Sequence, residues 1–163
     1  MTQAIQQFLE KIFSHEGVVF LLSLLPVSEI RGGMIAARLY DMNLLLAWLI
    51  AYLGNMLPIP FLLLFLKKIF GWMRRRPRLK KLVDWFDRKA AKHKKAIERS
   101  AWVGLFLLVA IPLPGTGAWT GALVANFFDI RLKRSLPTIA AGVAAAGIIM
   151  AVLLYAMPSL FGL

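Results

Sequence analysis

The stretch that most constrains the fold is residues 110–125, an apolar segment broken in its middle by Pro112-Leu-Pro-Gly-Thr-Gly117. Proline lacks a backbone N–H, and glycine readily adopts left-handed conformations, so a continuous helix through this stretch is not expected. Its flanks nevertheless have the composition of a membrane interior. Because non-helical backbone at membrane depth persists only inside protein or beside a wet cavity, the stretch predicts the tip of a re-entrant hairpin that faces a polar site.

The composition indicates an integral membrane protein with one membrane module over residues 1–163. The chain is 60% hydrophobic, and its mean hydropathy is +0.70, values too high for a soluble domain of this length. There is no cysteine. No cleavable signal is recognised, because the apolar run after Gly17 leads into charged residues rather than a small-residue cleavage site.

The net charge of +12 is unevenly placed. Of the 20 Lys and Arg residues, 14 lie in residues 67–99 and three more in residues 129–134. Basic residues beside membrane segments set topology and attract anionic lipid. A bilayer therefore explains the charge, and no nucleic-acid partner is predicted.

The first half of the chain contains a broken hairpin and a span. Residues 2–14 predict a short amphipathic helix in the membrane interface, ended by Ser14-His-Glu-Gly17. The apolar run 17–27 would reach ~16 Å as a helix, about half the hydrocarbon thickness, before a polar tip at residues 26–33. Residues 44–66 reach roughly 34 Å and can cross, although Pro58 and Pro60 would kink the helix.

The second half repeats this order after the basic segment 67–99. Within that segment, the residues after Pro77 predict a helix on an anionic membrane face, with a solvated linker helix as the alternative. A short apolar run (102–111), the proline-glycine tip, a second short run (118–128) and a spanning run (136–157) follow.

The two halves align without a gap at a constant offset of 88 positions, and the matched pairs include Gly33 with Gly121 and Asp41 with Asp129. Internal repeats with broken helices at matching positions are typical of transporters. If each hairpin returns to its own side, residues 67–99 and 129–134 share one side, as the positive-inside rule favours.

The predicted fold class is therefore an all-α inverted repeat of two re-entrant hairpins, each followed by one transmembrane helix, with interfacial amphipathic helices. The first repeat is 1–66, the basic cytoplasmic segment is 67–99, and the second repeat is 100–163. The expected location is the cell inner membrane, with both termini outside.

The first tip offers the candidate charged groups. Glu29 and Arg31 are the charged residues there, and ionisable groups inside a membrane are by default functional. A structural ion pair is the alternative. Arg31 and Arg38 share a helix face and could bind a phosphate together, although for Arg38 the stronger reading is an interfacial arginine whose charge reaches the headgroups.

The second tip offers a helix N-terminus. Gly115, Thr116 and Gly117 would present backbone N–H groups to an anion, or the glycines would only permit tight packing. Trp119 would line the cavity or pack in the core. No nucleophile, metal-ligand or P-loop pattern is present, so neither an enzyme nor a metal or cofactor is predicted.

At these residues the chain resembles a known family. Ser28-Glu-Ile-Arg-Gly-Gly33 and Pro112-Leu-Pro-Gly-Thr-Gly-Ala-Trp-Thr-Gly-Ala122 resemble the bacterial small multidrug export proteins, which are similar to the DedA/VTT superfamily. The resemblance implies two inverted re-entrant hairpins and the translocation of undecaprenyl phosphate or phospholipids. The chain departs from DedA proteins because it lacks the further basic pattern after the hairpin and has no acid at its second tip.

Two functions follow as expectations. The first is a DedA-like flippase that holds an anionic lipid phosphate between Arg31, oriented by Glu29, and the Gly115–Gly117 amides. The alternative is a proton-coupled exporter of small cationic compounds in which Glu29 is the switching carboxylate. A scaffold for envelope assembly is a third. The expected partners are membrane lipids, with homo-oligomerisation left open.

Overall fold

The computed structural model describes residues 14–75, 94–113 and 115–156, which form α-helices and one π-helix and include no strand. This agrees with the all-helical prediction. The elements are α2 (His15–Leu24), α3 (Glu29–Leu39), α4 (Leu44–Met56), α5 (Pro58–Arg74), α7 (Lys94–Ala110), α8 (Ala118–Phe127), α9 (Leu132–Ala151) and the π-helix η1 (Val152–Ala156). The amphipathic helices predicted at 2–14 and after Pro77 lie outside the described residues, apart from Ser14.

The first hairpin consists of α2 and α3. Ser14 caps α2 by accepting the N–H of Gly17 (3.1 Å). Residues 15–17, which had been expected to end a helix, therefore form the first turn of α2. The reason is that a serine followed by an apolar run satisfies free N–H groups at a helix start. The tip spans only residues 25–28, and Arg31 and Gly33 lie within α3. The predicted tip at 26–33 was therefore too long.

The second hairpin consists of α7 and α8. Helix α7 ends at Ala110 and α8 begins at Ala118, which confirms that no helix passes through the proline-glycine stretch. Gly115 and Gly117 have φ of 77° and 132°, the left-handed region that glycine adopts without a Cβ penalty. These two glycines let the chain reverse between the two helices.

Two long helical segments follow the hairpins. Leu44–Ile69 and Leu132–Ala156 are long and apolar enough to cross a membrane, and only 28% and 33% of their apolar windows are buried inside the protein. A core helix of a soluble protein would bury most of that surface. Lys67 and Lys68 do not end the first helix, which continues to Arg74, because lysine interrupts the apolar run but is a good helix former.

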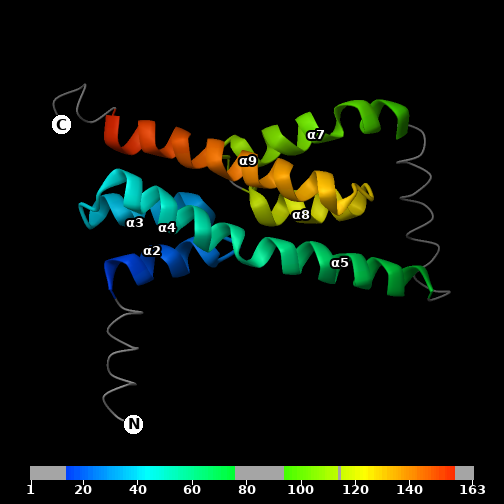
Figure 1. Cartoon of the computed structure of the whole chain (residues 1–163), viewed down its shortest axis with the longest axis horizontal. Coiled ribbons are helices and arrows are strands. Elements are labelled where there is room, and N and C mark those ends of the chain that lie inside the picture. Colours follow the sequence, from blue (N-terminus) through cyan, green and yellow to red (C-terminus); the bar gives the residue numbers. More distant parts are fainter. Residues whose placement is uncertain (1–13, 76–93, 114, 157–163) are drawn as a thin grey trace, which may run out of the picture.

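The two hairpins turn near the middle of the molecule and approach from opposite ends (Figure 1). Helix α2 starts at the end where α3 and η1 finish, whereas α7 starts at the end where α5 finishes. Helices α4 and α9 pack against each other between the hairpins. The 25–28 and 111–117 connections are thereby brought together.

The ends of α3 and α8 have matching backbone geometry. Asp41 and Asp129, 88 positions apart, have φ of 50° and 51°. One residue later, the N–H of Met42 donates to Ala37 O (3.0 Å), and the N–H of Ile130 donates to Ala125 O (2.8 Å). The offset found in the sequence thus coincides with a repeated local structure.

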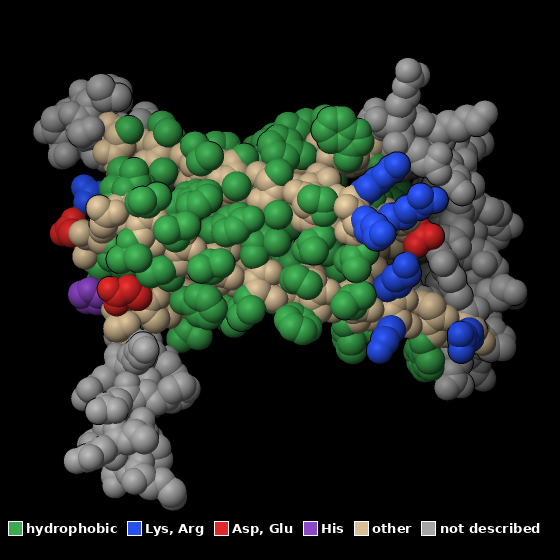
Figure 2. All heavy atoms as spheres, viewed as in Figure 1, with side chains coloured by type: hydrophobic (Ala, Val, Ile, Leu, Met, Phe, Trp, Pro, Cys, Tyr) green, Lys and Arg blue, Asp and Glu red, His purple; other side chains and the backbone are tan. Residues whose placement is uncertain are grey.

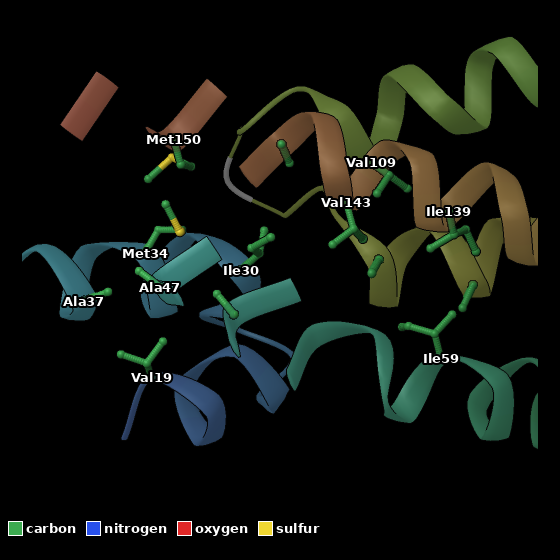
Figure 3. Close-up of a cluster of buried hydrophobic side chains, with 14 of the residues drawn as sticks. Val19, Ile30, Met34, Ala37, Ala47, Ile59, Val109, Ile139, Val143 and Met150 are labelled. Atoms are coloured by element: carbon green, nitrogen blue, oxygen red, sulfur yellow. The ribbon is translucent and has the colours of Figure 1, made fainter. Parts of the chain in front are cut away.

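The core runs along the molecule as one cluster that includes Val19 of α2, Ile30 of α3, Val109 of α7 and Val143 of α9 (Figure 3). The surface is largely apolar between two polar ends, and the described Lys and Arg side chains gather mainly at one of them (Figure 2). Leu39 and Phe61 are 78% and 71% exposed. Such a belt of exposed apolar side chains fits a hydrocarbon environment.

Candidate functional site

Glu29 is the buried acidic side chain at the point where the hairpins meet. It is the first residue of α3, has a φ of 50° and is 3% exposed. The backbone N–H of Ala118 donates to its Oε2 (3.3 Å), and the N–H of Trp119 donates to its Oε1 (3.2 Å). The carboxylate therefore sits at the N-terminus of α8, where free N–H groups and the helix dipole favour a negative charge.

Gly117 makes room for this carboxylate. It is the N-cap of α8, and a Cβ atom built on it would overlap the carboxylate oxygens of Glu29. Any other residue at this position would collide with Glu29 and would also have to adopt a φ of 132°. The glycine was predicted to expose amides to a ligand, and in the structure it admits a side chain of the first hairpin.

Arg31 holds the other side of the second tip. Its guanidinium donates to the carbonyl oxygens of Leu113 (2.7 Å), Thr116 (3.0 Å) and Ile111 (3.2 Å) and to the Thr116 hydroxyl (2.9 Å). In this connection, which contains Pro112 and the two tip glycines, several carbonyl oxygens face Arg31. The planar guanidinium has enough N–H groups to donate to all of them at once. Arg31 thus fixes the 111–116 connection to α3.

Thr116 completes this network. Its hydroxyl accepts from Arg31 and lies 2.8 Å from the carbonyl oxygen of Leu113, to which it can donate. The neighbouring carbonyl of Gly115 accepts from the hydroxyl of Thr120 (3.0 Å). The second tip is therefore ordered by hydrogen bonds on both sides rather than left open.

These contacts bring Glu29, Arg31, Thr116, Gly117 and Trp119 together, but not in the predicted way. Glu29 does not orient Arg31, because the one ion pair among the described residues is Arg38 with Asp41 (2.8 Å). The guanidinium of Arg31 contacts the opposite tip, and the amides at the start of α8 are occupied by the protein's own carboxylate.

Arg38 lies apart from this cluster. Its Nε donates to the carbonyl of Leu154 (3.2 Å), and its guanidinium lies 5.4 Å from the ring centroid of Tyr155. Arg31 and Arg38 therefore do not form the expected joint phosphate site. Two helical turns separate them along α3, about 10 Å, and each side chain contacts a different part of the second half of the chain.

The structure also reveals buried polar groups that the sequence analysis did not single out. Asn55 is fully buried, and neither its amide nitrogen nor its oxygen has a hydrogen-bond partner among the described residues. The indole nitrogen of Trp48 is likewise buried and has no partner among the described residues, as is that of Trp119, which the sequence analysis had named. The signal for Asn55 was present, since an amide inside an apolar run is costly without a partner.

No group of three or more His, Cys, Asp or Glu side chains that could hold a metal ion occurs among the described residues. What the site offers is a buried carboxylate that links two hairpins through hydrogen bonds.

Comparison with known proteins identifies a family. The model of a family described as "putative small multi-drug export protein" matches residues 29–149, a range that begins at Glu29 and includes the whole tip-to-tip contact. Neither the search of curated proteins nor the search of solved structures finds a match. Because the matched range covers most of the chain, this membrane protein belongs to the small multi-drug export protein family.

Proposed function

We propose that this protein exports small cationic compounds across the inner membrane in exchange for protons. The compound and the proton would compete for the carboxylate of Glu29. The observation that carries the proposal is the Glu29 carboxylate, buried at the meeting point of the two hairpins and bound to the N–H groups of Ala118 and Trp119. The family description supports transport of small compounds. Such a protein would act by binding and release and would not be an enzyme.

The proposed mechanism follows from the contacts of Glu29. An ionised carboxylate accepts both N–H groups and is favoured at a helix N-terminus by ~0.3–1 kcal/mol. A proton or a substrate cation on the carboxylate would weaken its contact with α8. Each binding event would therefore loosen the link between the hairpins, which can then shift relative to each other while Arg31 keeps the 111–116 connection in place.

The alternative, a DedA-like flippase for an anionic lipid phosphate such as undecaprenyl phosphate, ranks second. It requires a free cation and free amides at the tips. In the structure Arg31 donates to three carbonyls and a hydroxyl, and the amides of Ala118 and Trp119 are bound to Glu29. A phosphate at the Gly115–Gly117 amides would have to displace carbonyls from Arg31, and it would lie directly beside the N–H groups that already bind the Glu29 carboxylate.

The proposed topology is an inverted repeat in which both hairpins are re-entrant, with the basic end in the cytoplasm. The matched φ values at Asp41 and Asp129 support the repeat. The hairpins enter from opposite ends in Figure 1, and basic side chains gather at one end in Figure 2. The short hairpin helices α2 and α8 have 10 residues each, about 15 Å, half of what a crossing needs.

The test is transport of tetraphenylphosphonium by purified protein in liposomes under an imposed pH gradient. We expect wild type to move the cation against its gradient, and Glu29→Gln to abolish pH-driven transport, because the amide carries no exchangeable charge. Glu16→Gln is the matched control, since Glu16 lies exposed in the first turn of α2. Undiminished transport by Glu29→Gln, or tight binding of undecaprenyl phosphate that Arg31→Ala removes, would favour the flippase.

A further inference from the structure

Asn55 is a fully buried amide whose Oδ1 and Nδ2 atoms have no hydrogen-bond partner among the described residues. It lies in the last turn of α4, inside a segment that is long and apolar enough to cross a membrane. A buried amide is costly unless it is hydrogen-bonded, and the mechanism proposed above does not use this one. Asn55 therefore requires a partner that both donates and accepts.

The junction between α4 and α5 lies where the two hairpins meet. Helix α4 packs against α2 and α3 of the first hairpin, whereas α5 packs against α8 of the second. The junction is in the middle of the molecule, as are both tips (Figure 1). Asn55 comes three residues before Pro58, the first residue of α5, so it lies close to the tip-to-tip contact.

Ser23 of α2 relates the level of Asn55 to that of Glu29. Ser23 lies against Gly54, which precedes Asn55, and against Gly33, which is one turn after Glu29 in α3. Helix α3 starts in the middle of the molecule and α4 ends there (Figure 1). The two polar residues are therefore separated along the long axis by only about one helical turn, ~5 Å.

The two protonation states of Glu29 require different partners. An ionised carboxylate only accepts hydrogen bonds, which suits the N–H groups of Ala118 and Trp119. A protonated carboxyl donates through its O–H and accepts through its C=O. These groups match the Oδ1 acceptor and the Nδ2 donor of Asn55.

The other buried side-chain groups without a partner among the described residues do not match the protonated carboxyl. They are Nε of Arg31 and the indole nitrogens of Trp48 and Trp119, and all three are donors only. Asn55 is thus the one member of this set that could both accept from and donate to a carboxylic acid.

The internal repeat distinguishes Glu29 and Asn55 from the second half of the chain. At the offset of 88 positions, Glu29 matches Gly117 and Asn55 matches Val143. Val143 is 1% exposed and belongs to the apolar core, so a buried position of this kind does not need an amide for packing. The carboxyl and the amide occur together in the first half, and both are missing at the matched positions of the second.

Few other charges lie near Glu29. Helices α4 and α8 contain no charged residue, and the charged residues of α2 and α9 are in their first turns, at the ends of the molecule. Those of α7 lie in its first half and those of α5 in its second half, also away from the tips. Within α3, Arg31 is the neighbouring charge, and it donates to the second tip.

We propose that Asn55 receives the carboxyl of Glu29 when the carboxyl is protonated and leaves α8. The inference rests on the proposed export function and names the partner that holds Glu29 in its second position. Ionised Glu29 links the two hairpins through α8, whereas protonated Glu29 is held on α4 and leaves the hairpins free to shift. Proton uptake thereby selects between two positions of one side chain, and Asn55 acts as a positioning residue.

The test is infrared difference spectroscopy of the purified full-length protein in liposomes, between acid and neutral pH. The carboxyl C=O band that appears on acidification and is missing in Glu29→Gln belongs to Glu29. In wild type we expect the frequency of a hydrogen-bonded carboxyl. Asn55→Leu, which has a similar volume, should move the band to the frequency of a free carboxyl. It should also lower the pH of half-protonation by about one unit, a tenfold loss of proton affinity, because the acid form loses its partner.

Thermal midpoints show whether each variant is folded. If Asn55→Leu does not fold, Asn55→Val takes its place and must give the same changes, since valine occupies the matched position of the second half. Asn126→Leu is the matched control. The amide of Asn126 donates to the carbonyl of Ala122 within α8 (3.0 Å), so its replacement should leave both the band and the pH of half-protonation unchanged.

An unchanged band and pH of half-protonation in the folded Asn55 variant would overturn the inference and leave Asn55 with a buried water as its partner. Equal changes in Asn126→Leu would overturn it as well, because the effect would not be specific to Asn55. Tetraphenylphosphonium transport in the same liposomes separates the two proposals. Intact pH-driven transport with a band that ignores Asn55 removes only the role of Asn55, and an Asn55-dependent band without transport removes only the export proposal.

Discussion

The carboxylate of Glu29 fills the space that a side chain on Gly117 would need. Glu29 begins α3 in the first hairpin, and Gly117 caps α8 in the second. The two residues are 88 positions apart, which is also the offset between the two halves of the chain. The tips of the two hairpins are therefore in direct contact at these two residues. The following predictions test this contact and the packing and topology around it.

We predict that Gly117→Ala lowers the thermal midpoint in detergent much more than Gly115→Ala. Both glycines have positive φ, but an added Cβ at Gly115 meets nothing within 4 Å, whereas at Gly117 it overlaps Glu29. Backbone strain alone costs about 1–2 kcal/mol, and displacement of a buried carboxylate adds to it. Thermal unfolding of both variants gives the comparison, and equal losses would show that Glu29 does not occupy this position.

Arg31→Lys should destabilise the protein more than Arg38→Lys. A lysine at 31 retains the charge but cannot donate hydrogen bonds to three carbonyls and a hydroxyl at once. Each hydrogen bond from a charged donor contributes about 1.5–3 kcal/mol to stability. A lysine at 38 can still pair with Asp41, whose side chain is 86% exposed. Thermal midpoints and protease sensitivity of the 111–116 connection measure the difference. Similar behaviour of the two variants would contradict the role of Arg31.

Gly54→Ala should be strongly destabilising, and Gly104→Ala should be neutral or slightly stabilising. A Cβ on Gly54 would come within 2.6 Å of the carbonyl oxygen of Phe20, which is backbone and cannot move aside cheaply, whereas a Cβ on Gly104 meets nothing within 4 Å. Alanine also has the higher helix propensity, by up to ~1 kcal/mol. Thermal unfolding in detergent measures the stability of the two variants against wild type. A tolerated alanine at 54 would mean that α2 and α4 are not in close contact.

The topology can be tested with cysteines, because the chain has none of its own. We expect Glu16→Cys to react with an impermeant thiol reagent in intact cells, and Lys133→Cys to react only after the membrane is opened. Both positions are exposed and lie at the starts of α2 and α9. Labelling of both from outside would rule out the proposed inverted arrangement.

Much of the fold follows from local sequence. The prolines at 112 and 114 and the glycines at 115 and 117 forbid a continuous helix, and the structure has its break there. The lengths of the apolar runs predicted which segments could cross a membrane, and the two long helices agree. The errors were also local: residues 15–17 begin a helix, and α3 starts at Glu29, which shortens the first tip.

What the sequence by itself determined was the membrane class, the helix breaks and the position of Glu29 and Arg31 beside the first break, because these depend on composition and on residues near one another in the chain. Tertiary structure decided which groups those residues meet. Arg31 donates to carbonyls more than 80 positions away. Glu29 binds the amides of Ala118 and Trp119, next to the Gly115–Gly117 amides that had been assigned to a ligand. Trp48 keeps a buried indole N–H that has no hydrogen-bond partner among the described residues. Periodicity sets the face on which a side chain lies, but its partner depends on how two hairpins from opposite ends pack together.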